Sequence, residues 1–170
     1  LNATIKECPV FGGKLKSFDA SKVNAMKGVK KVVQVGDTAV AVVADTFWQA
    51  KMAMDQLPIV WDEGPNGSVQ QADIMKRLEE GLKADQAFVG NANGDFKKAA
   101  SDASKKIEAK FFYPFLNHAP MEPMNATVVW TPDKCEVWTA TQNAESALAT
   151  AATAAGLPIE KCDVYRLNLG

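Results

Sequence analysis

The apolar and polar positions in the first third of the chain predict a set of short strands. Four are expected, at residues 13–18, 29–35, 38–44 and 59–61. Residues 13–18 alternate polar and apolar side chains, which is the pattern of a half-buried strand. Residues 38–44 are almost entirely apolar, which is typical of a strand covered on both faces. Gly36, followed by Asp37, predicts a hairpin turn between the second and third strands.

Two helices are predicted between these strands. The first covers about residues 21–26 and ends before Gly28, because glycine readily adopts the left-handed conformation that stops a helix. The second covers residues 47–55 and is capped by Asp45 or Thr46. The resulting β-α-β-β-α-β order indicates a small α+β sandwich with its helices on one face of a sheet.

The remaining two thirds predict helices first and a second sheet later. Helices are expected at 70–83 and 95–102, and a long strand at 106–115. Residues 126–130 and 135–140 should then pair as antiparallel strands. An alanine-rich helix follows, which Asn143 caps and Gly156 terminates, and a last strand is expected at 163–169.

Composition and charge narrow the classes of function. The chain has 170 residues, of which 47% are hydrophobic and 23% charged, as in ordinary globular domains. A formal net charge of −1 gives no reason to expect a nucleic-acid partner. An RNA-binding module of the same element order would need exposed aromatic residues on its central strands, which 29–35 and 38–44 lack. No apolar run approaches the roughly 18–20 residues of a membrane span, so no membrane insertion by this chain is expected.

The cysteines and tryptophans are expected to be structural. Cys8, Cys135 and Cys162 form no CxxC pair, so free thiols are expected and a structural zinc or iron–sulfur site is not. The tryptophans lie within apolar patterns and are expected in the core: Trp48, Trp61, Trp130 and Trp138.

Residues 114–125 (PFLNHAPMEPMN) are the segment best suited to hold a ligand. They contain the only histidine, His118, the carboxylate Glu122 and three prolines, which predict a stiff turn without regular structure. Such a turn can hold side chains against a ligand, but His118 and Glu122 could equally serve only to satisfy backbone groups of the loop. One histidine with one carboxylate does not supply the three protein ligands that a metal site needs.

Four stretches, in order, carry a resemblance to a known family. They are PVFGGKLKSFDASKVNAMKGVKKVV (9–33), AVVADTFWQAKMAMDQLPIVWDEG (42–64), GDFKKAASDASKKIEAKFFYPFLNHAPMEPMNATV (94–128) and VWTATQN (137–143). Together they resemble the large, molybdopterin-binding subunit of the molybdenum hydroxylases, the xanthine oxidase and aldehyde oxidoreductase family. Within that family, the sequence is most similar to the beta subunit of bacterial isoquinoline 1-oxidoreductase-like enzymes.

The resemblance implies a fold, a reaction and partners. Residues 1–64 would form an α/β hammerhead-like domain, 65–104 a helical linker and 105–170 the truncated start of a molybdopterin-binding domain. The parent enzyme would be an oxidoreductase that oxidises N-heteroaromatic or aldehyde substrates, with water as the oxygen source and the molybdenum cofactor in the subunit. Its partners would be the remainder of its own large subunit, a small [2Fe-2S] subunit that carries the iron–sulfur clusters, and a small-molecule substrate. The resemblance is compatible with a location in either the bacterial cytoplasm or the periplasm.

The resemblance also implies which residues face the cofactor. The family runs from a turn of HAPMEP type to a TQ motif and then to a glycine-rich loop, so the cofactor-binding residues would be Asn117, His118, Glu122, Gln142 and Gly170. Glu122 would orient the turn, and Gln142 would hydrogen-bond to the backbone or the cofactor. No catalytic or metal-ligating residue is expected in this fragment, because the family's base glutamate lies outside it. Leu116 stands where xanthine oxidase-type members carry a glutamine, which favours the isoquinoline type.

The chain is expected to be a fragment of such a subunit. It stops at Gly170, directly after a predicted strand and where a ligand-binding loop would begin. We therefore expect the isolated 170 residues to have no catalytic activity. The alternative is a non-enzymatic small-molecule-binding or assembly module with hammerhead-like topology.

Overall fold

The computed structural model describes residues 1–86 and 88–169 and divides the chain into two compact units. The first unit is Leu1–Gly94 and the second is Asp95–Gly170. The predicted α+β class is confirmed, since the structure has mixed content, 30% helical and 27% strand. Among the helices of the described residues, none has the length and apolar character needed to cross a membrane.

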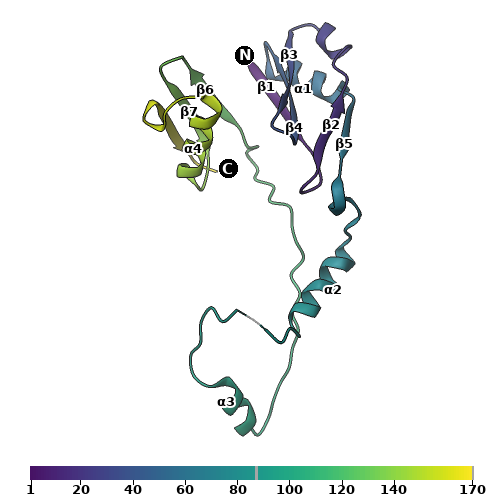
Figure 1. Cartoon of the computed structure of the whole chain (residues 1–170), viewed down its shortest axis with the longest axis vertical. Helices are drawn as coiled ribbons and strands as arrows, with labels where there is room; N and C mark the ends of the chain where they lie inside the picture. The colour runs from purple at the N-terminus through teal and green to yellow at the C-terminus, as the bar shows by residue number, and fades with distance from the viewer. Residues whose placement is uncertain (87, 170) are drawn as a thin grey trace. The chain divides into compact units, whose positions relative to one another are not determined.

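An apolar run makes strand β4 (Ala39–Ala44) the centre of the first sheet (Figure 1). It pairs antiparallel with β1 (Asn2–Glu7) on one side and with β3 (Val29–Val35) on the other. Helix α1 (Phe47–Gln56) packs beside this sheet, and its side chains complete the hydrophobic core. The buried core residues are Val23, Val40, Val42, Ala53, Met54 and Leu57. The prediction that 38–44 is covered on both faces is therefore confirmed over Ala39–Ala44.

Helix α1 begins where the sequence predicts, because Thr46 and Gln49 cap it reciprocally. The Gln49 backbone N–H donates to Thr46 Oγ1 over 3.3 Å, and the Thr46 N–H donates to Gln49 Oε1 over 3.1 Å. This capping box satisfies two backbone donors that the first turn would otherwise leave without partners. Of the two predicted caps, Thr46 is the one used.

The first unit differs from the prediction in three respects. Strand β1 was not predicted, although Ala3 and Ile5 alternate with polar residues there. The helix expected at 21–26 is only the 3₁₀ turn η1 (Val23–Ala25). The expected single sheet is divided, because β2 (Lys14–Phe18) and β5 (Ile59–Asp62) form their own antiparallel pair. A β-bulge between Leu15 and Ser17 disturbs that pairing.

Gly28 and Gly36 both have left-handed backbone conformations, and replacing each one tests how much that conformation contributes to the stability of the first unit. Their φ angles are +85° and +56°, but only at Gly28 would an added Cβ collide, with the side chain of Gln49. We expect Gly28→Ala to lower the free energy of unfolding by about 2–3 kcal/mol, because it adds the loss of the capping box to the conformational cost. Gly36→Ala, with open space around it, should cost about 1 kcal/mol. Equal losses in urea denaturation would contradict the role assigned to Gln49.

A helical and irregular stretch links the two units. The 3₁₀ turn η2 (Gly64–Ser68) precedes the predicted amphipathic helix, observed as α2 (Gln71–Gly81). The predicted short helix is present as α3 (Phe96–Asp102), with Asp95 as its N-cap. The predicted assignment of 65–104 as a linker, between a hammerhead-like domain at 1–64 and a cofactor domain from 105, remains a prediction.

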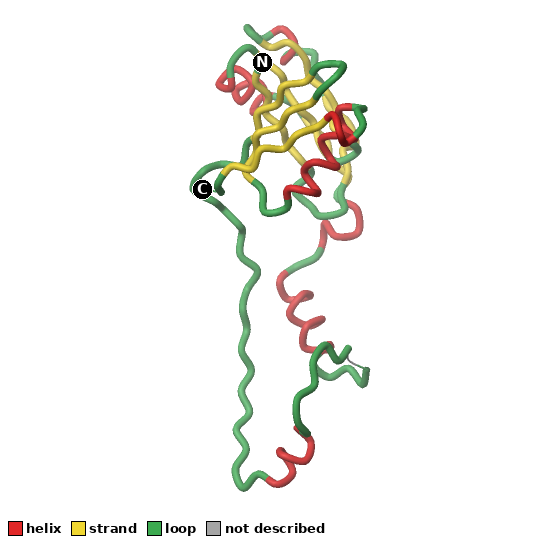
Figure 2. The backbone as a smooth tube through the Cα atoms, turned by 90° about the vertical axis from the view of Figure 1, so that its left-hand side faces the viewer, coloured by secondary structure: helices red, strands yellow, loops and turns green. Residues whose placement is uncertain are grey.

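The strand predicted at 106–115 is wrong. Residues 103–125 form one long loop between α3 and β6 (Figure 2), and aromatic side chains such as Phe111 and Tyr113 are more than four-fifths exposed. The alternation and aromatic content favour a strand, but a strand needs a neighbouring edge for its backbone hydrogen bonds. Within the described residues no strand pairs with this segment.

The second unit is a three-stranded sheet covered by one helix. Strands β6 (Ala126–Trp130) and β7 (Cys135–Ala140) pair antiparallel as predicted, and β8 (Cys162–Leu167) pairs parallel to β7. The crossover from β7 to β8 consists of α4 (Ala144–Ala155) and the 3₁₀ turn η3 (Ile159–Lys161). Gly156 ends α4 in the left-handed conformation, with φ of +68°.

The tryptophans follow the prediction only in part. Trp61 packs against the first core, and Trp138 is half-buried with its ring stacked on Tyr165 at 4.9 Å between centroids. Trp48 and Trp130 were expected in the core but are 66% and 56% exposed. Trp48 lies on the side of α1 away from the buried Ala50 and Ala53, so the helical pattern places it outward. The cysteines are free, as predicted.

Candidate functional site

The turn at 117–125 is tied to the sheet at its end. Asn125 Nδ2 donates to the carbonyl of Pro123 over 2.9 Å, and Thr139 Oγ1 donates to the Asn125 carbonyl over 3.2 Å. Ala126, the first residue of β6, pairs with Thr139 near the end of β7. This register brings the predicted turn and the predicted TQ motif to the same edge of the second unit.

The TQ motif is shaped by the cap of α4. Thr141 Oγ1 accepts a hydrogen bond from the Asn143 N–H, and Asn143 Oδ1 accepts one from the Ser146 N–H, both over 3.0 Å. Gln142 lies between these two capping residues, and its side chain is exposed. Its amide makes no hydrogen bond to any described residue, so both its donors and its acceptor are available to a ligand.

The two segments line one open pocket of about 410 Å³. Its lining residues are His118, Pro120, Met124, Ala140, Thr141, Gln142 and Leu169. The turn supplies the first three, β7 and the segment after it the next three, and the segment after β8 the last. The pocket therefore combines an imidazole, a hydroxyl and an amide with apolar side chains. This is the usual composition of a small-molecule site.

The structure separates the predicted site residues. His118 and Gln142 lie in the same pocket, whereas Glu122 lines a small adjoining recess with Met124, Asn125 and Leu169 among others. Asn117 is exposed and lines neither space in the described part of the unit. Gly170 lies outside the described residues.

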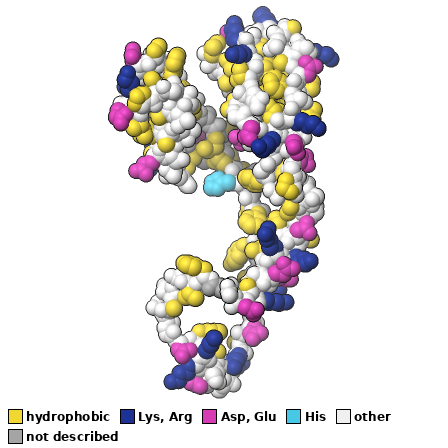
Figure 3. Space-filling view, viewed as in Figure 1, with side chains coloured by type: hydrophobic (Ala, Val, Ile, Leu, Met, Phe, Trp, Pro, Cys, Tyr) yellow, Lys and Arg dark blue, Asp and Glu magenta, His cyan; other side chains and the backbone are white. Residues whose placement is uncertain are grey.

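His118 and Glu122 do not satisfy loop backbone groups. Both side chains are exposed, and the imidazole is visible at the surface in cyan (Figure 3). Neither makes a hydrogen bond or ion pair with the residues that the structure describes. The backbone contacts of this turn come instead from Asn125 and Thr139. The structure therefore gives no support to a purely structural role for the two side chains.

Sequence reasoning missed the apolar half of the pocket. Met124, Ala140 and Leu169 line both the pocket and the recess beside it. Each stands next to a residue that the motifs had marked, namely Asn125, Thr141 and Gly170. Their proximity to motif residues was the available signal, but their contact across three segments depends on the sheet register.

No side-chain metal site lies in the described residues. Residues 1–86 and 88–169 contain no group of three or more histidine, cysteine, aspartate or glutamate side chains able to hold a metal ion.

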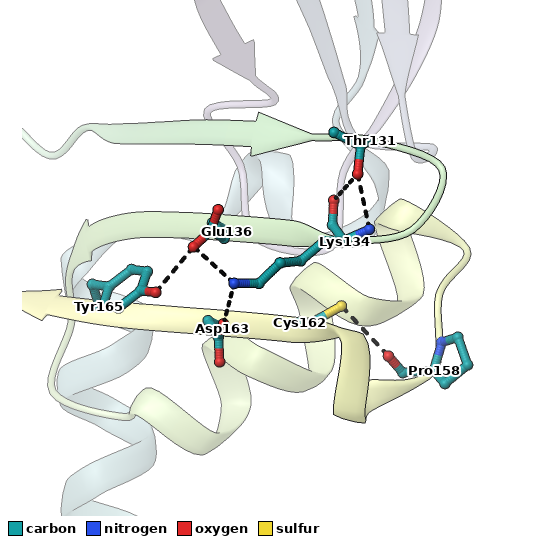
Figure 4. Close-up of polar contacts among 7 residues, drawn as sticks. All are labelled: Thr131, Lys134, Glu136, Pro158, Cys162, Asp163 and Tyr165. Carbon is teal, nitrogen blue, oxygen red and sulfur yellow. Dashed lines mark hydrogen bonds and ion pairs between the residues drawn. The ribbon is translucent and has the colours of Figure 1, made fainter.

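A polar network links strands β7 and β8 (Figure 4). Lys134 Nζ lies 3.0 Å from Glu136 Oε1 and 3.1 Å from Asp163 Oδ2, which joins β7 to β8. Tyr165 donates its hydroxyl to Glu136 Oε1 over 3.0 Å. The hydrogen bonds from Lys134 and then Tyr165 lower the pKa of Glu136, and the bond to Glu136 raises the pKa of Tyr165.

This network predicts a loss of stability in acid. A carboxyl group with a lowered folded pKa stabilises the fold above its unfolded pKa of about 4.5, and this contribution disappears as the pH falls through the folded value. We expect Glu136→Gln to have a smaller drop in urea midpoint between neutral pH and pH below 4.5 than the unsubstituted chain. Glu160→Gln, in the same unit, serves as the control and should retain the full drop. Identical acid profiles for all three would refute the assignment to Glu136.

Comparison with known proteins places the chain in a family. The model of the family described as molybdopterin cofactor-binding domain matches residues 79–170, which is more than half of the chain and contains the whole pocket. The chain therefore belongs to the molybdopterin cofactor-binding domain family. The predicted resemblance to the xanthine oxidase family is confirmed at this level.

Its relatives are oxidoreductases of the molybdenum hydroxylase family. A nicotinate dehydrogenase subunit from Pseudomonas putida is 26% identical over 132 residues, which are 78% of this chain and 11% of that protein. The molybdenum-binding subunit PaoC of aldehyde oxidoreductase from Escherichia coli O157:H7 is 27% identical over 76% of this chain and 17% of that protein. The chain thus spans between a tenth and a fifth of the length of these two relatives.

Solved structures share the fold. Aldehyde oxidoreductase from Desulfovibrio gigas superposes with a TM-score of 0.63 at 17% identity, over 96% of this chain and 23% of that one. Quinoline 2-oxidoreductase from Pseudomonas putida 86 gives the same TM-score and identity, over 95% of this chain and 26% of that one.

Proposed function

We propose that the chain is part of the molybdopterin-binding catalytic subunit of a molybdenum hydroxylase. The full enzyme would oxidise N-heteroaromatic or aldehyde substrates with water as the oxygen source. Membership of the molybdopterin cofactor-binding family supports this proposal. The names of the two relatives, a nicotinate dehydrogenase and an aldehyde oxidoreductase, support the two substrate classes.

The observation that carries the proposal is the pocket shared by the turn and the TQ motif. The exposed amide of Gln142 can both donate and accept hydrogen bonds, as the polar edge of a pterin requires. Thr141 and His118 add polar groups to the same pocket, and Met124 and Leu169 give a flat ring an apolar surface. The donor set therefore fits an organic cofactor that would be held through hydrogen bonds and apolar contact.

In the proposed enzyme, this chain binds and orients the cofactor. When bound, the molybdenum cofactor supplies the two-electron oxidation that side chains cannot perform. Gln142 and His118 would hold the cofactor in the pocket, and Glu122 would face it from the adjoining recess. Asn117, which is exposed at the start of the turn, would add a further polar contact. Gly170 is proposed as a further cofactor-binding residue.

We further propose that the enzyme belongs to the isoquinoline 1-oxidoreductase type. Leu116 supports this assignment, because xanthine oxidase-type members carry a glutamine at this position.

The proposed partners follow from the kind of relative found. Both relatives are named as subunits, which supports an assembly of several chains. In that assembly the remainder of the large subunit would complete the pocket. A small [2Fe-2S] subunit would carry electrons away from it.

The proposal is tested by comparing the chain with the complete subunit. The subunit produced from the whole gene, together with its small partner, should contain molybdenum and oxidise isoquinoline or an aromatic aldehyde when an artificial electron acceptor is supplied. The isolated 170 residues should show no turnover with either substrate. Molybdenum-dependent turnover by the isolated chain, or a complete subunit that never contains molybdopterin, would overturn the proposal.

A further inference from the structure

Two of the three cysteines face each other across parallel strands. Cys135 begins β7, Cys162 begins β8, and the two are direct partners in the register of the sheet. Both thiols are free, and the residues are only 3% and 5% exposed. They share one core cluster with Ala152 of α4, so both side chains lie on the face of the sheet that α4 covers.

This placement permits a bond between the two sulfur atoms. Neighbouring strands lie about 4.8 Å apart, and disulfides join residues whose Cα atoms are about 4.4–6.8 Å apart. Burial first, and the neighbouring Cys135 next, raise the pKa of Cys162, as the close placement of the two residues leads one to expect. Cys162 Sγ also lies 3.6 Å from the carbonyl of Pro158, at the end of the crossover (Figure 4).

The two thiols are similarly buried, but only one of them lines a pocket. Cys135 lines an open, mostly apolar pocket of about 270 Å³ between β6, β7 and α4, whereas Cys162 is not among its lining residues. The other walls are Val128, Trp130, Val137, Ala151, Ala154 and Ala155. Trp130 is held at the rim because its indole N–H donates to the carbonyl of Ala155 over 3.3 Å. The pocket therefore offers a small apolar reagent a route to Cys135.

We propose that Cys135 and Cys162 form a redox-active dithiol, in which Cys135 is the attacking thiol and Cys162 the resolving one. The oxidant is a small apolar disulfide. The Cys135 thiolate attacks one of its sulfur atoms, which forms a mixed disulfide and releases the first small thiol. The Cys162 thiolate then attacks Cys135 Sγ and releases the second. Two protein thiols lose two electrons and two protons, and the small disulfide gains them as two thiols.

The pair can work independently of cofactor chemistry, since it lies on the opposite end of β7 from Thr141 and Gln142. The new bond would join β7 to β8 across the whole crossover that contains α4. Cross-linking of residues far apart in the chain restricts the unfolded state, so oxidation should raise the thermal midpoint of the second unit by several degrees, roughly 5–10 °C. Reduction would reverse the change.

The test uses 4,4′-dithiodipyridine, a small aromatic disulfide, on the folded chain carrying Cys8→Ser to remove the third thiol. We expect release of two thiopyridone molecules per chain, a final mass lower by two hydrogen atoms, and a peptide cross-link between positions 135 and 162. In Cys162→Ala the reaction should stop after one release and leave a thiopyridyl adduct on Cys135. In Cys135→Ala, the remaining Cys162 should react about tenfold more slowly or worse.

The controls separate this chemistry from the reactivity of unfolded chains. Alanine is the replacement because a buried cysteine packs as a small apolar side chain, and circular dichroism should show each variant folded. Reaction of the pair only in denaturant, a stable adduct on Cys135 with Cys162 present, or an undiminished rate in Cys135→Ala would each overturn the proposal. None of these outcomes depends on molybdenum, so failure here is distinct from failure of the proposed enzymatic function.

Discussion

Replacing Val42 with aspartate is expected to unfold the first unit while the second stays folded. Val42 is completely buried at the centre of β4, within a cluster of exclusively apolar side chains. A carboxylate placed there would have no partner and would lose its hydration. We expect a loss of more than about 4 kcal/mol, which exceeds much of the stability of an ordinary domain.

The measurement is amide hydrogen exchange of the full chain, read separately at β4 and at β7. Amide exchange of β4 should become unprotected, whereas exchange of β7 should retain the protection seen before substitution. Val60→Asp is the matched control, because Val60 is the same residue type on strand β5 and is 51% exposed. That control should change the free energy of unfolding by less than about 1 kcal/mol. Loss of protection in β7 together with β4 would show that the two units fold as one.

Replacing Gln142 with alanine should weaken cofactor retention by the intact subunit. Under the proposed function, this amide is the unpartnered hydrogen-bonding group of the pocket nearest to the cap of α4. Loss of hydrogen bonds to a bound group typically costs about 1–2 kcal/mol, so molybdopterin should dissociate or exchange about tenfold more readily. The fold should be unaffected, because the exposed side chain makes no hydrogen bond to a described residue.

The measurement is the molybdenum and pterin content of the purified subunit after dialysis against a chelator. Gln71→Ala provides the control, since Gln71 is an exposed glutamine at the start of α2 and lies outside the pocket. The control should retain cofactor like the unsubstituted subunit. Equal retention by the Gln142 and Gln71 variants would remove Gln142 from the proposed site.

The local parts of the fold could be predicted because nearby residues determine them. Strand β4 follows from an unbroken apolar run, and the caps at Thr46 and Asn143 follow from side chains that bond to backbone groups three residues away. The strand expected at 106–115 fails for the opposite reason. Its pattern is local, but its stability depends on a partner edge that local sequence does not specify.

The site could be predicted only as two separate motifs. Residues 117–125 were identifiable by their prolines and single histidine, whereas Thr141 and Gln142 were identifiable only through the family's TQ motif. Their meeting depends on the pairing of Ala126 with Thr139, which is a long-range property of the sheet. The facing cysteines depend in the same way on the parallel register of β7 and β8, which no spacing in the sequence predicts.

The most direct test of the account is an experimental structure of the intact subunit with its cofactor bound. The account predicts that the side chain of Gln142 lies within hydrogen-bonding distance of molybdopterin, with His118 and Met124 along the same pocket. A cofactor bound with no contact to the 117–125 turn or to Thr141–Asn143 would contradict it. In that case this part of the chain would serve the fold of the subunit and not its active site.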